Sequence, residues 1–529
     1  MPSKNDISAV RPKKAAPVRD PREEAFVAAV GGRAKWAARG AFLHVAELAL
    51  PGTSTAGGLE LPLMPCLTKL EVSDSGLTSL DVSKCPRLEK LAAAGNGLTS
   101  LRLSKNILLG EADVSGNKLA GLFLDKNVAL TRLNASGNLL EFLSLSKNRS
   151  LRALDVSRNK LADLELPETA ALERLNASHN RLDGLDVSKN PGLKELKAQF
   201  NNLQFLNVDE NALLAELSAL SNPLERLDVS KNLALTSLSA SGGRLRELDV
   251  KNNAALKALR VTDSQLDCLD LSRNAALTDL HFSSSQVRTA DFSDNPALDN
   301  LEVFCDELTS LEISKNAALT RLEVSCGRLP GLDVSKNASL ISLKVSCSSL
   351  KKLDLSGNPV LSDLQILEGG LRKLDVSKNP KLAFLRVSDN KLAALDLSKN
   401  LLMEKLIAPG NKLTSVTLPS EKAGLLILVN LRGNKLRHLD LTKSAGLRML
   451  NLGANKIREL DLSGNVKLDY LNVCKNKLQE IDLSHITELR SLEINNNPLN
   501  SLDLSKNSKL TKVERGGIPL KKIVMPKKY

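Results

Sequence analysis

The sequence predicts a β-solenoid, a right-handed stack of parallel coils with short strands on both sides and little helix. The first observation is a leucine that returns every 21 residues, as in Leu80–Lys84 (Leu-Asp-Val-Ser-Lys) and again from Leu185 and from Leu227. The second is that this step persists from position 80 to position 416, where every slot except Ala290 holds Leu or Val. A fixed period in this range means that one unit is stacked on copies of itself, because a single unit cannot bury its own apolar face.

The period is nested, because a second leucine series alternates with the first at steps of 10 and 11 residues. Each half follows the pattern L-x-x-L-x-Φ-x-x-N, in which Φ is apolar, as in Leu88, Leu91, Ala93 and Asn96. In this pattern the chain resembles the leucine-rich repeats, in the short nested 21-residue variety called IRREKO-type, known from bacteria and protists. The resemblance covers roughly residues 45–515 and implies a parallel β-solenoid with a binding role. It identifies no partner.

Each half repeat predicts a short strand followed by a turn. The two apolar residues of L-x-Φ share one face of a strand, since alternate side chains point to opposite sides. The Asn suits the turn, because its side chain bonds nearby backbone groups and it tolerates unusual φ. No half repeat is long enough for a helix, so we expect about 21 to 22 coils built from strands and turns.

The two ends differ from the repeats in charge and pattern. We expect a disordered basic arm over residues 1–20, a helical N-terminal cap over 21–44 with Asp20 as N-cap and Pro21 in the first turn, and a C-terminal cap and basic tail over 516–529. The net charge is +13, and residues 1–40 and 512–529 each contribute +5, which leaves the solenoid nearly neutral. The basic residues expected to attract acidic surfaces are Lys4, Arg11, Lys13, Lys14, Arg19, Lys521, Lys522, Lys527 and Lys528.

Composition favours an intracellular protein. No apolar run reaches the ~18 residues of a membrane span, and the amino terminus has no signal-peptide core. Seven cysteines without paired spacing favour a reducing, cytoplasmic setting. We expect no membrane span and no cofactor.

One face of the solenoid is monotonous and is interpreted as structural. An acidic residue follows the repeating leucine in unbroken succession from Asp228 to Asp396, and Lys or Arg recurs three residues later. An acidic row could bind calcium, but the neighbouring lysines neutralise it and no clustered acid-glycine loop is present. We expect no metal here.

The opposite face varies. Its Asn series runs from Asn96 to Asn222, fails for seven coils, and resumes at Asn390. Cys305, Cys326 and Cys347 share one repeat position in the gap, and thiols in a straight column at ~4.8 Å cannot converge on a tetrahedral zinc. Outward apolar residues on this face suggest a protein-interaction patch. They are Phe304, Ile341, Leu367, Phe384 and Ile407.

One coil is irregular. The step from Val416 to Leu439 is 23 residues, and the excess falls in 419–424. Insertions in repeat proteins loop out on one face, so we expect a tolerated bulge, with a partner-contacting loop as the alternative.

The residues do not support catalysis. The five histidines lie at unrelated repeat positions, and no phosphate-binding glycine loop is present. The sequence therefore predicts a non-enzymatic scaffold that binds protein partners through its extended surface, with nucleic acid disfavoured because aromatic and basic residues are not interleaved. Two alternatives stay open: a structural component of a cytoskeletal, microtubule-type or other large assembly docked through the basic termini, and a secreted effector without a cleavable signal.

Overall fold

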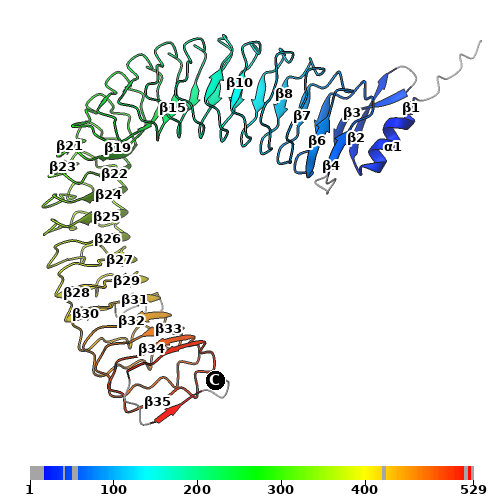
Figure 1. The fold of residues 1–529 in the computed structure, drawn as a ribbon. Helices are drawn as coiled ribbons and strands as arrows, with labels where there is room; N and C mark the ends of the chain where they lie inside the picture. The colour runs from blue at the N-terminus through cyan, green and yellow to red at the C-terminus, as the bar shows by residue number, and fades with distance from the viewer. Residues whose placement is uncertain (1–16, 40–41, 51–56, 420–424, 518–521, 526–529) are drawn as a thin grey trace, which may run out of the picture. The chain divides into compact units, whose positions relative to one another are not determined.

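The computed structural model is a parallel β-solenoid of about 23 turns with almost no helix (Figure 1), which confirms the predicted fold class. It describes residues 17–39, 42–50, 57–419, 425–517 and 522–525. The chain forms two compact units, unit 1 (1–224) and unit 2 (225–529), each of which is described by itself. In both units every turn contributes one strand to a parallel sheet, the main sheet, while the opposite side of the coil, the second side, carries short paired strands.

Unit 1 is built on three-residue strands. Its main-sheet strands are β3 (Phe42–Ala49), β5 (Lys69–Glu71), β7 (Lys90–Ala92), β8 (Glu111–Asp113), β9 (Arg132–Asn134), β11 (Ala153–Asp155), β13 (Arg174–Asn176), β14 (Glu195–Lys197) and β15 (Glu216–Ala219). Its second side carries β4 (Gly57–Glu60), β6 (Leu77–Asp81), β10 (Phe142–Ser144) and β12 (Asp163–Glu165). Neighbouring turns pair in a constant register of 21 residues, as in Leu154 opposite Leu175.

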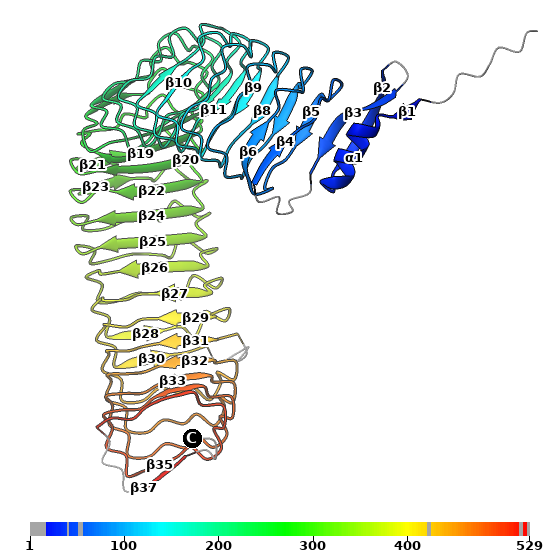
Figure 2. The ribbon, with the colours of Figure 1, turned by 45° about the vertical axis from the view of Figure 1, so that its right-hand side comes forward.

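Unit 2 contains longer strands. Its main-sheet strands are β17 (Ser237–Ser241), β19 (Ala258–Ser264), β20 (Asp279–Ser284), β22 (Asn300–Phe304), β24 (Arg321–Cys326), β25 (Ser342–Cys347), β26 (Asp363–Leu367), β27 (Phe384–Arg386), β29 (Lys405–Ile407), β31 (Leu428–Asn430), β32 (Met449–Asn451), β33 (Tyr470–Asn472), β34 (Ser491–Glu493) and β36 (Lys512–Glu514). Its second side carries β16 (Arg226–Asp228), β18 (Glu247–Asp249), β21 (Thr289–Asp291), β23 (Ser310–Glu312), β28 (Ala394–Asp396), β30 (Ser415–Thr417), β35 (Ser501–Asp503) and β37 (Lys522–Val524). Figure 2 shows β20 to β26 as a stack of wide arrows.

The repeating apolar residues form the core, as the pattern predicts. Leu175 and Leu343 on the main sheet are almost completely buried, and so is Leu227 on the second side. A charge placed at any of these positions would meet only apolar neighbours from the adjacent turns.

The Asn series on the main-sheet side closes each turn by hydrogen bonds. The Oδ1 of Asn138 accepts the N–H of Leu119 at 3.0 Å, and its Nδ2 donates to the carbonyls of Val114 (2.9 Å) and Ala135 (3.1 Å). The residue before each such Asn has positive φ, for example +64° at Gly137. A side chain that satisfies three buried backbone groups allows the chain to leave the sheet after a three-residue strand.

Where that Asn is missing, the strands are longer. In β19 to β26, which we call the ladder-free stretch (258–367), strands have five to seven residues. There the chain continues as a strand past the inward Leu and Val, and a third inward residue becomes buried, such as Cys305, Cys326 or Cys347. Backbone pairing with the neighbouring turn thus replaces the Asn side chain.

A second Asn series lies on the second side. Asn316 is fully buried, and its Nδ2 donates to the carbonyls of Phe292 (2.9 Å) and Asn295 (2.7 Å). The acidic row beside it also has a structural role, because Asp333 Oδ1 accepts the backbone N–H of Ser335 at 2.9 Å. This bond lowers the pKa of Asp333, to which the Ser335 hydroxyl also contributes.

The N-terminal cap differs from the predicted helix over 21–44. Helix α1 spans only Pro21–Ala29, capped by Asp20, and ends before Gly31, whose φ is +63°. Residues 33–39 form strand β2 (Arg33–Arg39), which pairs antiparallel with β3. The Gly31-Gly32 pair stops the helix, and β2 covers the edge that the first repeat strand would otherwise expose.

The arms are ordered in part. Strand β1 (Val18–Arg19) pairs with β3, and Arg19 forms an ion pair with Glu24 at 3.0 Å and lies over the Trp36 ring, so the predicted disorder of 1–20 is wrong at Arg19. Strand β37 pairs with β35 and places the backbone of Lys522 in the second side. Lys4, Arg11, Lys13, Lys14, Lys521, Lys527 and Lys528 lie outside the described residues.

The 23-residue coil does not disturb the main sheet. Strands β29 and β31 pair with Leu406 opposite Val429, two residues beyond the usual step. The bond from Asn434 Nδ2 to the Ala408 carbonyl (2.9 Å) likewise spans 26 residues in place of 24. Residues 420–424, where the excess was expected, lie outside the described part of the chain.

Candidate binding surfaces on the main sheet

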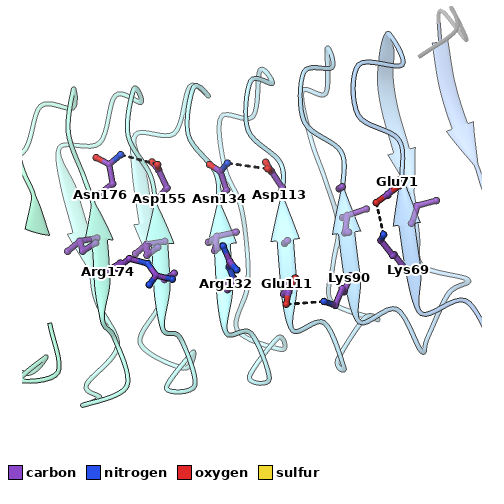
Figure 3. Close-up of a pocket in the computed structure, with 18 of the residues that line it drawn as sticks. Lys69, Glu71, Lys90, Glu111, Asp113, Arg132, Asn134, Asp155, Arg174 and Asn176 are labelled. Carbon is purple, nitrogen blue, oxygen red and sulfur yellow. Dashed lines mark hydrogen bonds and ion pairs between the residues drawn. The ribbon is translucent and has the colours of Figure 1, made fainter. Parts of the chain in front are cut away.

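The main sheet of unit 1 carries a groove of about 570 Å³ that crosses the turns from β5 to β14 (Figure 3). Two rows of outward side chains line it, one on each side of the buried leucines. The first row contains Lys69, Lys90, Glu111, Arg132, Ala153, Arg174 and Glu195. The second contains Glu71, Ala92, Asp113, Asn134, Asp155, Asn176 and Lys197.

The second row is held rigidly by hydrogen bonds between turns. Asn134 Nδ2 donates to Asp113 Oδ2 at 3.2 Å, and Asn176 Nδ2 donates to Asp155 Oδ2 at 2.9 Å. The other oxygen of each carboxylate accepts from a serine; Ser157, for example, donates its hydroxyl to Asp155 Oδ1 at 2.6 Å. These amides and carboxylates are therefore preorganised acceptors and donors for a bound backbone.

The first row presents free guanidinium groups at its centre. Lys90 pairs with Glu111 at 3.1 Å, and Lys69 pairs across the rows with Glu71 at 2.7 Å. Arg132 and Arg174 are exposed and form no ion pair with any residue in the described part of unit 1. The small Ala153 lies between them, so the two guanidiniums flank an open position about two strand spacings wide, ~10 Å.

The sequence analysis did not single out this groove. Its signal is present in the sequence, because a basic residue recurs one position before the buried leucine and an acid or amide one position after it. Attention to apolar residues and to the net charge of the body concealed the two rows, whose charges nearly cancel.

The predicted interaction residues lie along unit 2, but they do not form one patch. Phe304 and Leu367 occupy the same outward column at the ends of β22 and β26, and both are half-buried. Phe384 begins β27, Ile407 ends β29, and both are also half-buried. Ile341 lies in the turn before β25 and is the one exposed member of the set.

Polar side chains surround these apolar residues. Phe304 packs against the His281 ring with centroids 5.1 Å apart, and His281 Nδ1 contacts Glu302 Oε2 at 2.5 Å. Asp363 lies opposite Phe384 in the register, and burial raises the pKa of its carboxyl group. The ladder-free stretch therefore presents a broad, mixed polar and apolar face.

The most exposed phenylalanines are elsewhere, and sequence reasoning missed them. Phe123 (81% exposed) and Phe142 (54%) lie on neighbouring turns of the second side of unit 1, and Phe205 (70%) lies three turns further along. Only the varied face had been searched for apolar residues.

One acid–histidine cluster has metal-ligand composition among the described residues: Asp20, Glu23 and His44. The buried Glu23 contacts His44 Nδ1 at 2.8 Å and accepts the N–H of Val45, while Asp20 caps α1. These contacts fasten α1 to β3. Separately, burial raises the pKa of the Cys305 thiol to about 11, which disfavours the reactive thiolate.

The comparisons with known proteins agree with the fold. A family model described as "Leucine Rich repeat" matches residues 147–164 and 346–364. No curated protein matches the chain. Within the described residues no helix has the length and apolar character needed to cross a bilayer.

Three solved structures illustrate the likeness. YopM from Yersinia enterocolitica shares 22% identity over 90% of this chain and 91% of that chain, with a TM-score of 0.56. The plant peptide hormone receptor RGFR1, in complex with RGF2, gives 16% identity, 88% and 81% coverage, and a TM-score of 0.55. The Arabidopsis receptor kinase HAESA, in complex with the peptide hormone IDA and the co-receptor SERK1, gives 17%, 89% and 86%, and 0.53. By repeat pattern and fold, the chain is a leucine-rich-repeat protein.

Proposed function

We propose that the protein is a non-enzymatic scaffold that binds an extended peptide segment of a partner protein along the main sheet of unit 1. The observation that carries the proposal is the groove of about 570 Å³ with a cationic row and an acid–amide row on either side of the core leucines. An extended peptide offers backbone N–H and C=O groups, which the Asp113–Asn134 and Asp155–Asn176 pairs would bind. Arg132 and Arg174 would bind an acidic group of the peptide, since a guanidinium matches a carboxylate bidentately.

The known structures support this class of function. RGFR1 and HAESA were solved with peptide hormones on leucine-rich-repeat folds of similar extent. The mixed face of the ladder-free stretch, with Phe304, Leu367 and Phe384, would give further specificity through contacts that are largely indifferent to salt. The seven cysteines are free thiols, which supports a reducing, cytoplasmic location.

Selection of binders from a displayed random-peptide library tests the proposal. Peptides selected on the full chain should carry an acidic residue and should lose most of their affinity, about 10-fold or more, for the double variant Arg132→Ala, Arg174→Ala. The matched control is Lys105→Ala with Lys126→Ala, which removes the same charge from exposed second-side loops of unit 1. Selected peptides that bind the groove variant as tightly as the wild type would contradict the proposal.

A further inference from the structure

A second hollow, of about 740 Å³, lies on the second side of unit 2 and is strongly basic. Six of its lining residues are cations, namely Lys351, Lys352, Arg372, Lys373, Lys378 and Lys391, against two carboxylates, Asp354 and Asp375. The half-buried Leu353 and the buried Leu355 contribute apolar surface to it. The body of the chain is nearly neutral, so this local excess of positive charge is a distinct feature.

The two carboxylates are occupied by the fold. Asp354 Oδ1 accepts the backbone N–H of Ser356, and Asp375 Oδ1 accepts that of Ser377, both at 2.9 Å. Lys351, Lys352, Arg372 and Lys373 are exposed and form no ion pair with the described residues of unit 2. Four cations thus share one hollow without a counter-charge from the chain.

The hollow lies where regular pairing on the second side stops. Between β23 and β28 the described residues of that side form only an isolated bridge, Gly331 with Lys352. The neighbouring main-sheet strands β25 and β26 stay paired, with Ser342 opposite Asp363, so the turns themselves remain stacked. Residues 21 positions apart therefore occupy neighbouring turns, which places Lys351 beside Arg372 and Lys352 beside Lys373.

We propose that this hollow binds a ligand that carries two phosphoryl groups. Two like charges on neighbouring turns, about 4.8 Å apart, repel each other, and one dianionic phosphoryl group placed between them neutralises both. The pair Lys351–Arg372 would hold one group, and the pair Lys352–Lys373 the other. A carboxylate would neutralise one cation of each pair and leave the other without a counter-charge.

Two observations argue against a nucleic acid as the occupant. No aromatic side chain lines the hollow, so unpaired bases would have no stacking platform. The hollow is bounded and confined to about three turns, whereas a strand of nucleic acid follows a long continuous groove. The site is also separate from the groove proposed for peptide binding, so either assignment stands without the other.

Calorimetry with inorganic pyrophosphate at low ionic strength tests the site in the full chain. The quadruple variant Lys351→Ser, Lys352→Ser, Arg372→Ser, Lys373→Ser should bind about 10-fold or more weakly, because four exposed charge contacts are lost. The control removes four lysines from equivalent second-side loops, Lys105, Lys126, Lys147 and Lys189, each changed to Ser. The control should bind within about twofold of the wild type, since distant exposed charges are largely screened. Circular dichroism of both variants checks that they fold.

Further arms define the ligand. Orthophosphate should bind more weakly than pyrophosphate, and a peptide with two phosphoserines should compete with pyrophosphate if the phosphoryl groups are carried by a protein. Equal loss in the quadruple variant and the control, or no pyrophosphate binding by the folded wild type, would overturn the proposal. It would also be overturned by equal affinity for orthophosphate, or by single-stranded RNA that binds at these residues and is not displaced by pyrophosphate.

Discussion

The Asn-bearing turns of unit 1 and the ladder-free stretch of unit 2 have the same period but turn the chain differently. In unit 1 the amide of Asn138 satisfies the backbone at the end of a three-residue strand. In the ladder-free stretch the strand continues, and the neighbouring turn satisfies the backbone by pairing. The leucine period therefore specifies the core, whereas one residue per repeat specifies how wide the sheet is and which side chains its face presents.

The largest effect should come from the feature that both regions share. Leu175→Asp in unit 1 and Leu343→Asp in unit 2 each bury a charge among apolar neighbours, so each should lower the free energy of unfolding by several kcal/mol, measured by urea denaturation. The control is Ser342→Asp, next to Leu343 but outward, at a position that holds Asp279 and Asp363 in other turns. Its effect should stay within about 0.5 kcal/mol. Equal losses for Leu343→Asp and Ser342→Asp would contradict the inward and outward assignment.

A smaller effect should separate the two regions. Asn138→Ala leaves the Leu119 N–H and the Val114 carbonyl without their partner in a buried turn, so it should cost about 2–4 kcal/mol. Ser285→Ala changes the same repeat position in the ladder-free stretch, where Ser285 is exposed, and should cost less than about 0.5 kcal/mol. If both substitutions destabilise equally, backbone pairing does not replace the Asn.

The cysteine column tests what fills the additional inward position. We expect the triple change of Cys305, Cys326 and Cys347 to Ser to cost about 1–3 kcal/mol in total, because Ser284 occupies the same position of β20 and donates its hydroxyl to the Leu266 carbonyl at 2.7 Å. Elemental analysis of the purified wild type should give no stoichiometric zinc. A loss larger than that of Asn138→Ala, or one zinc per chain that disappears in the triple variant, would show that the thiols do more than fill space.

The smallest effect should be common to both regions and visible only in acid. Backbone hydrogen bonds from serine lower the pKa of Asp333, Asp354 and Asp375 below the ordinary value of about 4. The folded state thus binds protons less readily than the unfolded state, and the stability these carboxylates contribute is present above pH 4 and is lost as pH falls through their folded pKa.

The triple variant Asp333→Asn, Asp354→Asn, Asp375→Asn should match the wild type at pH 7 and show a shallower fall in Tm below pH 4. Asparagine suits the position, because Asn207 already accepts the N–H of Asp209 there at 2.9 Å. Identical acid profiles for the two proteins would show that these bonds do not govern the response.

The sequence was sufficient for the fold because each turn repeats the same burial of leucine. It located the gap in the Asn series, but the longer strands there depend on pairing between turns, which is a property of the stack and not of one repeat. The end of α1 at Ala29 was missed because Arg33–Arg39 has no pattern that distinguishes a strand from a helix; its pairing with β3 decides the matter. The groove at Arg132 and the hollow at Lys352 were missed because each combines side chains from several turns, whereas charge had been counted only along the chain.

Strand β2 has a consequence for self-association. A parallel stack ends in a row of unpaired backbone groups, which is a template on which another molecule could add its own strands and build a fibre. Here the terminal strand runs antiparallel to the stack and carries exposed charge at Arg33, Lys35 and Arg39. A second copy that approached this edge would meet the same positive charges, so β2 should keep the N-terminal end monomeric, and its deletion should produce polymers that grow from that end.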